Sequence, residues 1–414
     1  MNMLNEVDGV MHVERVPLPD IARAFGTPCY VYSKAALEHN YAELAHALSA
    51  HEALICYAVK ANSNLAILNL FARAGAGFDI VSGGELERVI AAGGDPRKTV
   101  FSGVGKSAAE IRFALAREIL CFNVESEDEL MRIDDLARAA NVRASISLRV
   151  NPDVDAKTHP YIATGLKSNK FGVAYEDARA LYHRAAALGY VDIRGIDCHI
   201  GSQITELAPF ADAIDKVLEL VDALERDGIR LEHIDVGGGL GIRYRDETPP
   251  SFSAYAQTIA ERFGNRAQRL IIEPGRALVG NAGLLLTRVE YLKHNDDHAF
   301  AIIDAGMNDL MRPALYGAHH EIISVTRRAL AAQNYDVVGP VCESADVFGR
   351  ARSLAIAQND LLAILSAGAY GSSMTSRYNT RPAPCEVIVD GEDIFEIRTR
   401  EKISELFSHE KLLP

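Results

Sequence analysis

The sequence predicts an α/β fold in which an eight-stranded (β/α)8 barrel is joined to a second, all-β domain. Between residues 54 and 280, short β-branched runs alternate with longer helical patterns, and eight of these runs are typical of strands. After residue 281, strand-like runs follow one another without long helices between them. Eight strand–helix units favour a closed barrel, and an open doubly wound sheet is the competing architecture.

The barrel strands are predicted from these runs. They are residues 54–62, 75–82, 99–104, 120–124, 143–150, 192–200, 231–236 and 269–273. Two of the segments between them begin with a serine that is followed three residues later by a glutamate, a pattern that caps a helix start. These pairs are Ser107 with Glu110 and Ser126 with Glu129. Helices are therefore expected after strands, as a parallel barrel requires.

The second domain is expected to be sandwich-like or barrel-like. Its predicted strands are residues 284–292, 299–303, 322–326, 336–338, 361–365 and 385–389. The segment before the barrel contains the β-prone run Tyr30-Val31-Tyr32, which we expect to pair into this domain. The predicted boundaries are 34–281 for the barrel, and 1–33 with 282–414 for the β domain.

Composition excludes several classes of function. A net charge of -13 and the absence of a long basic run argue against a nucleic-acid partner. The first residues lack the charged and apolar parts of a signal peptide, and no apolar run is long enough to cross a membrane, so we expect a cytoplasmic protein. The six cysteines show no CxxC spacing, so neither a disulfide framework nor a metal site is indicated.

Polar residues end the predicted strands, where the active site of a barrel lies. Lys60 ends the first strand, Asp79 the second and His199 the sixth, while Gly237, Gly238 and Gly239 follow the seventh and Glu273 follows the eighth. Each has a simpler reading: a lysine that reaches solvent, a buried structural histidine, a solvent-facing carboxylate or a tight turn. A dinucleotide-binding fingerprint fails, because its third glycine would fall at Ile242.

Taken together, these residues predict a site for pyridoxal 5'-phosphate. A lysine in an apolar setting can form an imine, and backbone N–H groups of a glycine-rich turn can hold a phosphate. Glu273 would then face the pyridine nitrogen and keep it protonated. His199 could stack on the ring, and Ser202 could donate to the phosphate.

At these residues the chain resembles the fold-type III pyridoxal phosphate decarboxylases, and within them the diaminopimelate decarboxylases. The general resemblance rests on the motifs 57–62, 77–85, 199–203, 235–239 and 273–276. The narrower one rests on 151–159, 164–172, 307–316, 339–346 and 369–371. One departure is the segment 374–379, where the family more often has Ser and Asn in place of Thr375 and Arg377.

The resemblance implies roles for further residues and a homodimer with shared active sites. It implies that the cofactor is bound by Lys60, Asp79, His199, Ser202, Gly237, Gly238, Gly239, Glu273, Gly275, Arg276 and Tyr370. It implies an amino-acid substrate bound by Arg276, Arg312, Tyr316, Glu343 and Tyr370. Catalysis would use Lys60, His199 and Cys342, with Cys342 as proton donor, and Cys342 and Glu343 would come from the partner chain.

The distal end of the substrate separates the closest alternatives. Diaminopimelate presents a carboxylate there, which arginine can bind bidentately, whereas a substrate with only a distal amine calls for acidic residues. Arg312 and Arg276 therefore favour decarboxylation of meso-diaminopimelate to L-lysine over the ornithine or arginine reaction. A catalytically silent paralogue would be expected to lose Lys60, Cys342 or the glycines, and all remain. A racemase lacks the Cys342-Glu343 motif.

Overall fold

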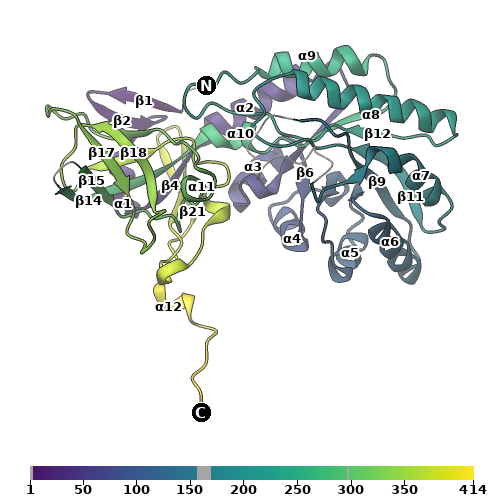
Figure 1. The fold of residues 1–414 in the computed structure, drawn as a ribbon. Coiled ribbons are helices and arrows are strands. Elements are labelled where there is room, and N and C mark those ends of the chain that lie inside the picture. Colours follow the sequence, from purple (N-terminus) through teal and green to yellow (C-terminus); the bar gives the residue numbers. More distant parts are fainter. Residues whose placement is uncertain (1–2, 156–168, 296–297) are drawn as a thin grey trace. The chain divides into compact units, whose positions relative to one another are not determined.

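The computed structural model describes residues 3–155, 169–295 and 298–414. Two compact units make up the chain, one of residues 1–40, 243–247 and 278–414, the other of residues 41–242 and 248–277. We call them the β unit and the barrel unit (Figure 1). Parts of two motifs from the sequence, residues 156–159 and 164–168, lie outside the described residues.

The barrel unit contains a closed sheet of eight parallel strands. They are β5 (Ala53–Ala58), β6 (Gly77–Ile80), β7 (Thr99–Phe101), β8 (Cys121–Val124), β9 (Ala144–Asn151), β11 (Val191–Asp197), β12 (His233–Asp235) and β13 (Arg269–Ile272). Each pairs with the next, and the pairing of β13 with β5 closes the ring. The predicted (β/α)8 TIM barrel is confirmed, and the open doubly wound sheet is wrong. The two-residue strand β10 (Val173–Ala174) adds to β9.

Most strands end earlier than the apolar runs predict. The ladder between β5 and β6 stops at Ala58, whose N–H donates to the Pro274 carbonyl 3.1 Å away in the loop after β13. Lys60 therefore lies in a 3-10 turn, η1 (Val59–Ala61), and not in the strand. His199 follows β11, and Glu273 follows β13. These side chains stand in the loops at the carboxyl ends of the strands, the catalytic end of such barrels.

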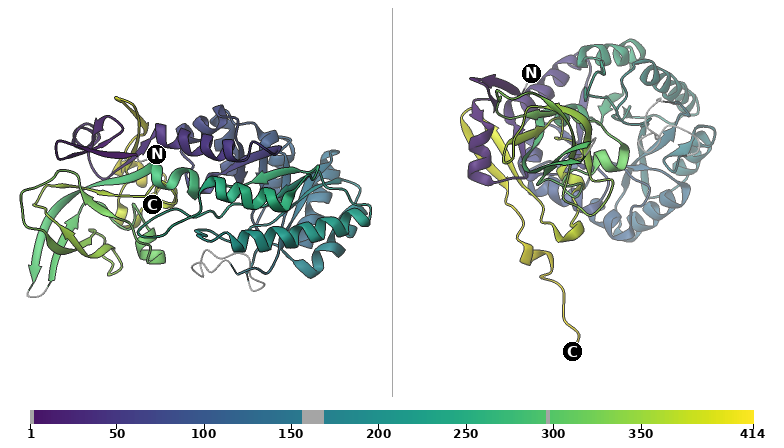
Figure 2. Two further views of the ribbon diagram at one scale, coloured as in Figure 1. Left: turned by 90° about the horizontal axis from the view of Figure 1, so that it is seen from above. Right: turned by 60° about the vertical axis from the view of Figure 1, so that its left-hand side comes forward.

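Helices cover the outside of the barrel (Figures 1 and 2). They are α3 (Leu65–Arg73), α4 (Gly83–Ala91), α5 (Ala108–Leu115), α6 (Glu127–Ala140), α7 (Tyr175–Ala186), α8 (Ala208–Arg226) and α9 (Phe252–Phe263). Ser107 and Glu110 form the predicted reciprocal cap of α5. Ser126 accepts from the Glu129 N–H at the start of α6, but the Glu129 carboxylate binds Lys106 instead of completing the cap.

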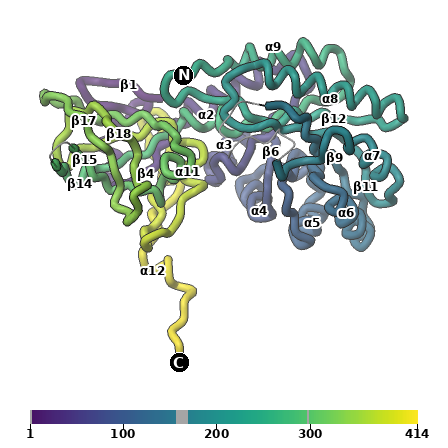
Figure 3. Tube along the Cα trace, in the orientation of Figure 1, coloured from purple at the N-terminus to yellow at the C-terminus, as the bar shows by residue number. Residues whose placement is uncertain are grey.

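The β unit is built on the long strand β14 (Gly283–Asn295). Strand β4 (Cys29–Ser33) pairs antiparallel with β14 and parallel with β20 (Cys385–Asp390). The predicted pairing of the N-terminal run is therefore confirmed, and Figure 3 shows the purple β4 among the later strands of this unit. The remaining strands here are β15 (His298–Ile303), β16 (Ile322–Ser324), β17 (Gln333–Val338), β18 (Val347–Leu354), β19 (Leu361–Ile364), β21 (Asp393–Arg398) and the set β1 (Leu4–Val7), β2 (Val10–Val13) and β3 (Val16–Pro17).

Short helices complete the β unit. They are α1 (Leu18–Phe25), α11 (Arg312–Tyr316) and α12 (Ile403–Leu406). Strands β18, β21 and β1 to β3 were not predicted, because exposed polar residues interrupt their apolar pattern. Among the described residues, no helix is both long and apolar enough to cross a membrane.

Candidate active site

Lys60 is paired with a fully buried carboxylate of the barrel wall. Its Nζ donates to Oδ2 of Asp79, which lies on β6 with no exposed surface. The Lys60 side chain keeps about a third of its surface exposed, so the amine is held by Asp79 and still reachable from the barrel opening. Among the residues that the structure describes, Asp79 Oδ1 has no hydrogen-bond partner. A reachable amine on an acidic anchor is the arrangement that holds an aldehyde cofactor.

The triple glycine after β12 forms a close-packed turn. Gly237 and Gly239 have φ values of +68° and +110°, which side chains disfavour. A Cβ at Gly237 would lie 2.5 Å from the Cys198 carbonyl oxygen, and one at Gly238 would overlap the Glu273 carbonyl oxygen. Only glycine fits here. The turn brings backbone next to the loops that carry His199 and Glu273, as a phosphate site requires.

His199 accepts a hydrogen bond from this turn. The Gly238 N–H donates to His199 Nδ1 over 3.2 Å, so this nitrogen carries a lone pair and the neutral ring carries its proton on Nε2. Loss of solvent holds the pKa of His199 well below its ordinary value, and the positive charges of Arg149 and Lys60 lower it further. A neutral, flat ring fixed by the backbone is suited to stacking on a cofactor.

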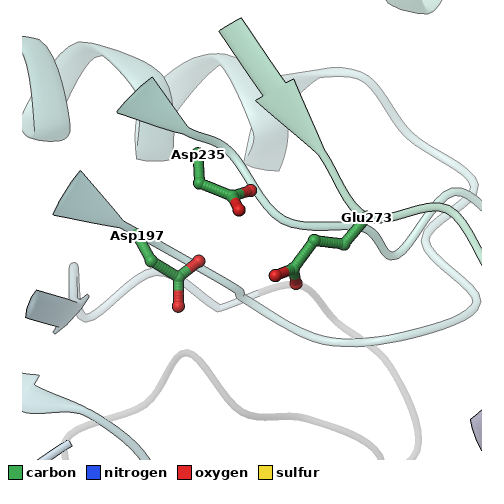
Figure 4. Close-up of side chains that lie close together, drawn as sticks. All are labelled: Asp197, Asp235 and Glu273. Atoms are coloured by element: carbon green, nitrogen blue, oxygen red, sulfur yellow. The ribbon is translucent and has the colours of Figure 1, made fainter. Parts of the chain in front are cut away.

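Three buried carboxylates lie together beneath the barrel opening. Oxygen atoms of Asp197, Asp235 and Glu273 all lie within 4.8 Å of one another (Figure 4). Burial raises the pKa of Asp197 to about 7, and it raises the pKa values of Asp235 and Glu273 well above their ordinary range. Repulsion from Asp197 and Asp79 raises the pKa values of Asp235 and Glu273 further. Like charges this close cannot all ionise, so the cluster holds protons at neutral pH.

Other polar side chains tie this cluster into the barrel. Arg149 Nη1 donates to Glu125 Oε1 over 3.2 Å, and its Nε lies 3.9 Å from Asp197 Oδ2. Asn123 Nδ2 lies 3.4 Å from Glu273 Oε1. Both oxygens of Asp197 lack hydrogen-bond partners within the described part of the chain.

The residues present fit pyridoxal phosphate. Glu273 belongs to a cluster that holds protons, which suits a carboxylate that must share one with a basic ring nitrogen. Arg276 is buried and donates from Nη2 to Ser202 Oγ over 3.0 Å. Ser202 follows Gly201, whose carbonyl oxygen would lie 2.5 Å from a Cβ at Gly239 of the glycine turn. Gly275 packs against Ala61 and Ala58, where a Cβ would lie 3.0 and 3.1 Å away. The predicted cofactor residues of the barrel unit thus follow or end the strands at their carboxyl ends, with Lys60 in η1 and Arg276 at the start of the short helix α10 (Arg276–Val279).

Lys106 is a second buried lysine, with a structural setting. Its three protons go to the Gly103 carbonyl (2.8 Å), the Asn123 carbonyl (2.8 Å) and Glu129 Oε1 (2.7 Å). Its side chain is 1% exposed. Because every proton is used and no solvent reaches it, Lys106 stabilises the barrel and Lys60 is the reactive candidate.

The predicted substrate residues of the β unit differ in setting. Arg312 begins α11 and is buried, and its Nη1 lies 2.8 Å from Nε2 of the buried His320. Tyr316 ends the same helix and is partly exposed. Tyr370 is partly buried and has a φ of 54°, an uncommon backbone conformation for this residue type that is typical of functional positions.

Cys342 and Glu343 are exposed on a loop that is held in place by hydrogen bonds of the buried Asp346. The carboxylate of the buried Asp346 accepts from the N–H groups of Met307 and Val341, each at 2.7 Å. Glu343 Oε1 accepts from the Tyr378 hydroxyl at 2.6 Å. The thiol of Cys342 is thus presented outward from a rigid loop.

Comparison with known proteins identifies the family to which this chain belongs. Residues 34–280 match the family described as pyridoxal-dependent decarboxylase, pyridoxal binding domain. The diaminopimelate decarboxylase of Vibrio cholerae is 56% identical over 98% of both chains, and that of Pseudomonas aeruginosa is 56% identical over the full length of both. The chain belongs to the diaminopimelate decarboxylase family. The solved structure of the Helicobacter pylori enzyme complexed with L-lysine has a TM-score of 0.92 and 42% identity, covering 95% of this chain and 99% of that one.

Family membership confirms the predicted enzyme class, a pyridoxal-dependent decarboxylase. Sequence reasoning missed Asp197, Arg149, His320 and Tyr244. Asp197 and Arg149 could have been found because each is a charged residue within an apolar strand run. A charged side chain is rarely buried unless an opposite charge lies beside it. His320 and Tyr244 lie outside every motif used, and only the folded chain brings them to Arg312.

Proposed function

We propose that this protein decarboxylates meso-diaminopimelate to L-lysine and CO2, the last step of lysine biosynthesis. The observation that carries the proposal is the pairing of Lys60 with Asp79 in a barrel whose glycine turn and Glu273 fit pyridoxal phosphate. Several relatives at 44–56% identity are named diaminopimelate decarboxylase, and one solved relative holds L-lysine.

The barrel residues bind and orient the reacting end of the substrate. When bound, the cofactor withdraws electrons from the carbon that loses its carboxylate. Lys60 is the amine that holds the cofactor, and Asp79 keeps that amine at the opening. Glu273, whose pKa burial raises well above its ordinary range, would share a proton with the ring nitrogen, and the neutral His199 ring would stack on the cofactor without adding charge.

Arg312 binds the distal carboxylate. A planar guanidinium matches a carboxylate bidentately, and burial strengthens the interaction by removing competing water. We expect Arg312→Lys to weaken substrate binding about tenfold or more while cofactor affinity stays unchanged, because lysine lacks the fork. Substrate KM and the cofactor dissociation constant, measured in parallel, check this. Equal loss of both would make Arg312 structural.

Cys342 supplies the proton that replaces the carboxylate, and it does so for a second copy of the chain in a homodimer. Its exposure, with that of Glu343, supports this role, since a residue that serves another copy must lie on the surface. Glu343 would bind the distal amine.

Mixed dimers test the shared site. Lys60→Ala and Cys342→Ala chains are each expected to be inactive alone. Unfolded and refolded together at equal amounts, they should regain about a quarter of wild-type turnover, because half of the dimers carry one complete site. Absence of any recovery would contradict delivery of Cys342 from the partner.

The runner-up function is decarboxylation of ornithine or arginine. It would need acidic residues instead of Arg312 at the distal end, and parallel assays of the three amino acids decide between them.

A further inference from the structure

The guanidinium of Arg312 is held by two side chains that no motif of the sequence includes. His320 Nε2 lies 2.8 Å from Arg312 Nη1, and the Tyr244 ring lies with its centroid 4.5 Å from the Arg312 Cζ. The Tyr244 and His320 rings meet edge to face, with centroids 5.4 Å apart and planes at 79°. All three residues belong to the β unit.

The hydrogen bonds of His320 determine which nitrogen carries its proton. Arginine has only N–H donors, so Nε2 must accept from Arg312. His320 Nδ1 lies 2.8 Å from the Leu365 carbonyl, which can only accept, so Nδ1 must carry the proton. The ring is therefore neutral, with one donor and one acceptor, and both are used. No part of His320 is exposed to solvent.

These contacts fix the plane of the guanidinium. The bond to His320 commits one Nη1 proton, and the Tyr244 ring covers one face of the group. Bidentate binding of a carboxylate depends on that plane, since both N–H groups must point at both oxygens together. An arginine without such support would lose rotamer freedom on binding, which weakens binding.

We propose that His320 is a positioning residue for carboxylate recognition: as a neutral acceptor locked by Leu365, it orients Arg312, with Tyr244 as the second side of the clamp. This inference rests on the proposed role of Arg312 at the distal carboxylate. It predicts that His320 affects ligands that keep this carboxylate and leaves other ligands unchanged.

Two product-like ligands provide the test. L-Lysine keeps the distal amine and carboxylate, whereas cadaverine has no carboxylate. Their dissociation constants are measured on the protein loaded with pyridoxal phosphate, from the change in visible absorbance of the bound cofactor. The variants are His320→Leu, which removes the acceptor at similar size, and His320→Gln, whose Oε1 reaches about as far as Nε2 and restores an acceptor. Arg312→Lys is measured alongside.

We expect His320→Leu to weaken L-lysine about tenfold, equivalent to about 1.4 kcal/mol, with cadaverine changed by less than about twofold. His320→Gln should recover most of the L-lysine affinity. Melting temperature and cofactor absorbance check that each variant folds, and if His320→Leu does not fold, His320→Gln against Arg312→Lys still gives the comparison.

The outcomes separate the two claims. If Arg312→Lys weakens L-lysine selectively and neither His320 variant does, the positioning role is overturned and the role of Arg312 stands. If His320→Leu weakens both ligands equally, or if His320→Gln is no better than His320→Leu, His320 is structural and the proposal fails. If Arg312→Lys itself shows no selective loss, the distal-carboxylate role fails and the proposal falls with it.

Discussion

Asp197 makes the stability of the cofactor-free protein fall as the pH rises. Its pKa is raised from 3.8 to about 7 in the folded chain, mainly by burial, with repulsion from Glu125 and Asp79 opposing the attraction of Arg149. The folded state therefore keeps a proton that the unfolded state has released. A raised folded pKa contributes stability that is fully present below about pH 4 and is lost as the pH rises to about 7.

The magnitude follows from the shift. Each pH unit in this window costs about 1.4 kcal/mol for one retained proton, so the full window costs up to about 4 kcal/mol. Asp197→Asn carries no charge at any pH and lacks this loss. Between about pH 5 and about pH 8, the unfolding free energy of Asp197→Asn should therefore rise relative to wild type by about 3 kcal/mol.

Urea unfolding of the cofactor-free protein, followed by far-ultraviolet circular dichroism at both pH values, measures this difference. Asp212→Asn, at an exposed position of α8, is the control and should show no pH-dependent gap. A pH-dependent difference for Asp197→Asn no larger than that of the control would show that Asp197 does not retain a proton in the folded protein.

Three further predictions concern the barrel and the loop of the β unit. Lys106→Met leaves Glu129 buried without its partner and should lower the unfolding free energy by about 3–5 kcal/mol; a urea midpoint equal to wild type would contradict it. Gly238→Ala places a Cβ on a backbone carbonyl oxygen and should weaken cofactor binding at least tenfold by absorbance titration. Gly189→Ala should not, because a Cβ added there meets no atom of another described residue within 4 Å, its chain neighbours aside. Cys342→Ala should keep the cofactor absorbance and slow turnover strongly; unchanged turnover would remove Cys342 from the mechanism.

The sequence predicted the barrel well because its signals are local. Alternating strand and helix patterns do not depend on long-range contacts, and polar residues at strand ends meet in any closed parallel barrel. Lys60 and Glu273 could be located in this way even though both lie in loops just beyond their strands. Strand limits were too long because apolar composition continues past the last paired residue, where the chain turns at η1.

The carboxylate cluster was harder to predict. Whether Asp197 and Asp235 face the interior beside Glu273 depends on the stagger of three strands, which a single sequence does not contain. The contacts of Arg312 with His320 and Tyr244 could not be predicted either, because they join residues that are distant in the sequence. Tyr244 lies within the stretch assigned to the barrel, yet residues 243–247 belong to the β unit. A short segment that leaves one unit for the other produces no periodic pattern in the sequence.

The proposed reaction is tested most directly by supplying the purified protein, loaded with pyridoxal phosphate, with meso-diaminopimelate, ornithine and arginine in parallel. CO2 release and the amine product are measured for each. We expect CO2 from meso-diaminopimelate alone, with L-lysine formed in equal amount. CO2 from ornithine or arginine instead would contradict the distal-carboxylate role of Arg312, and no CO2 from any of the three would contradict the decarboxylase assignment itself.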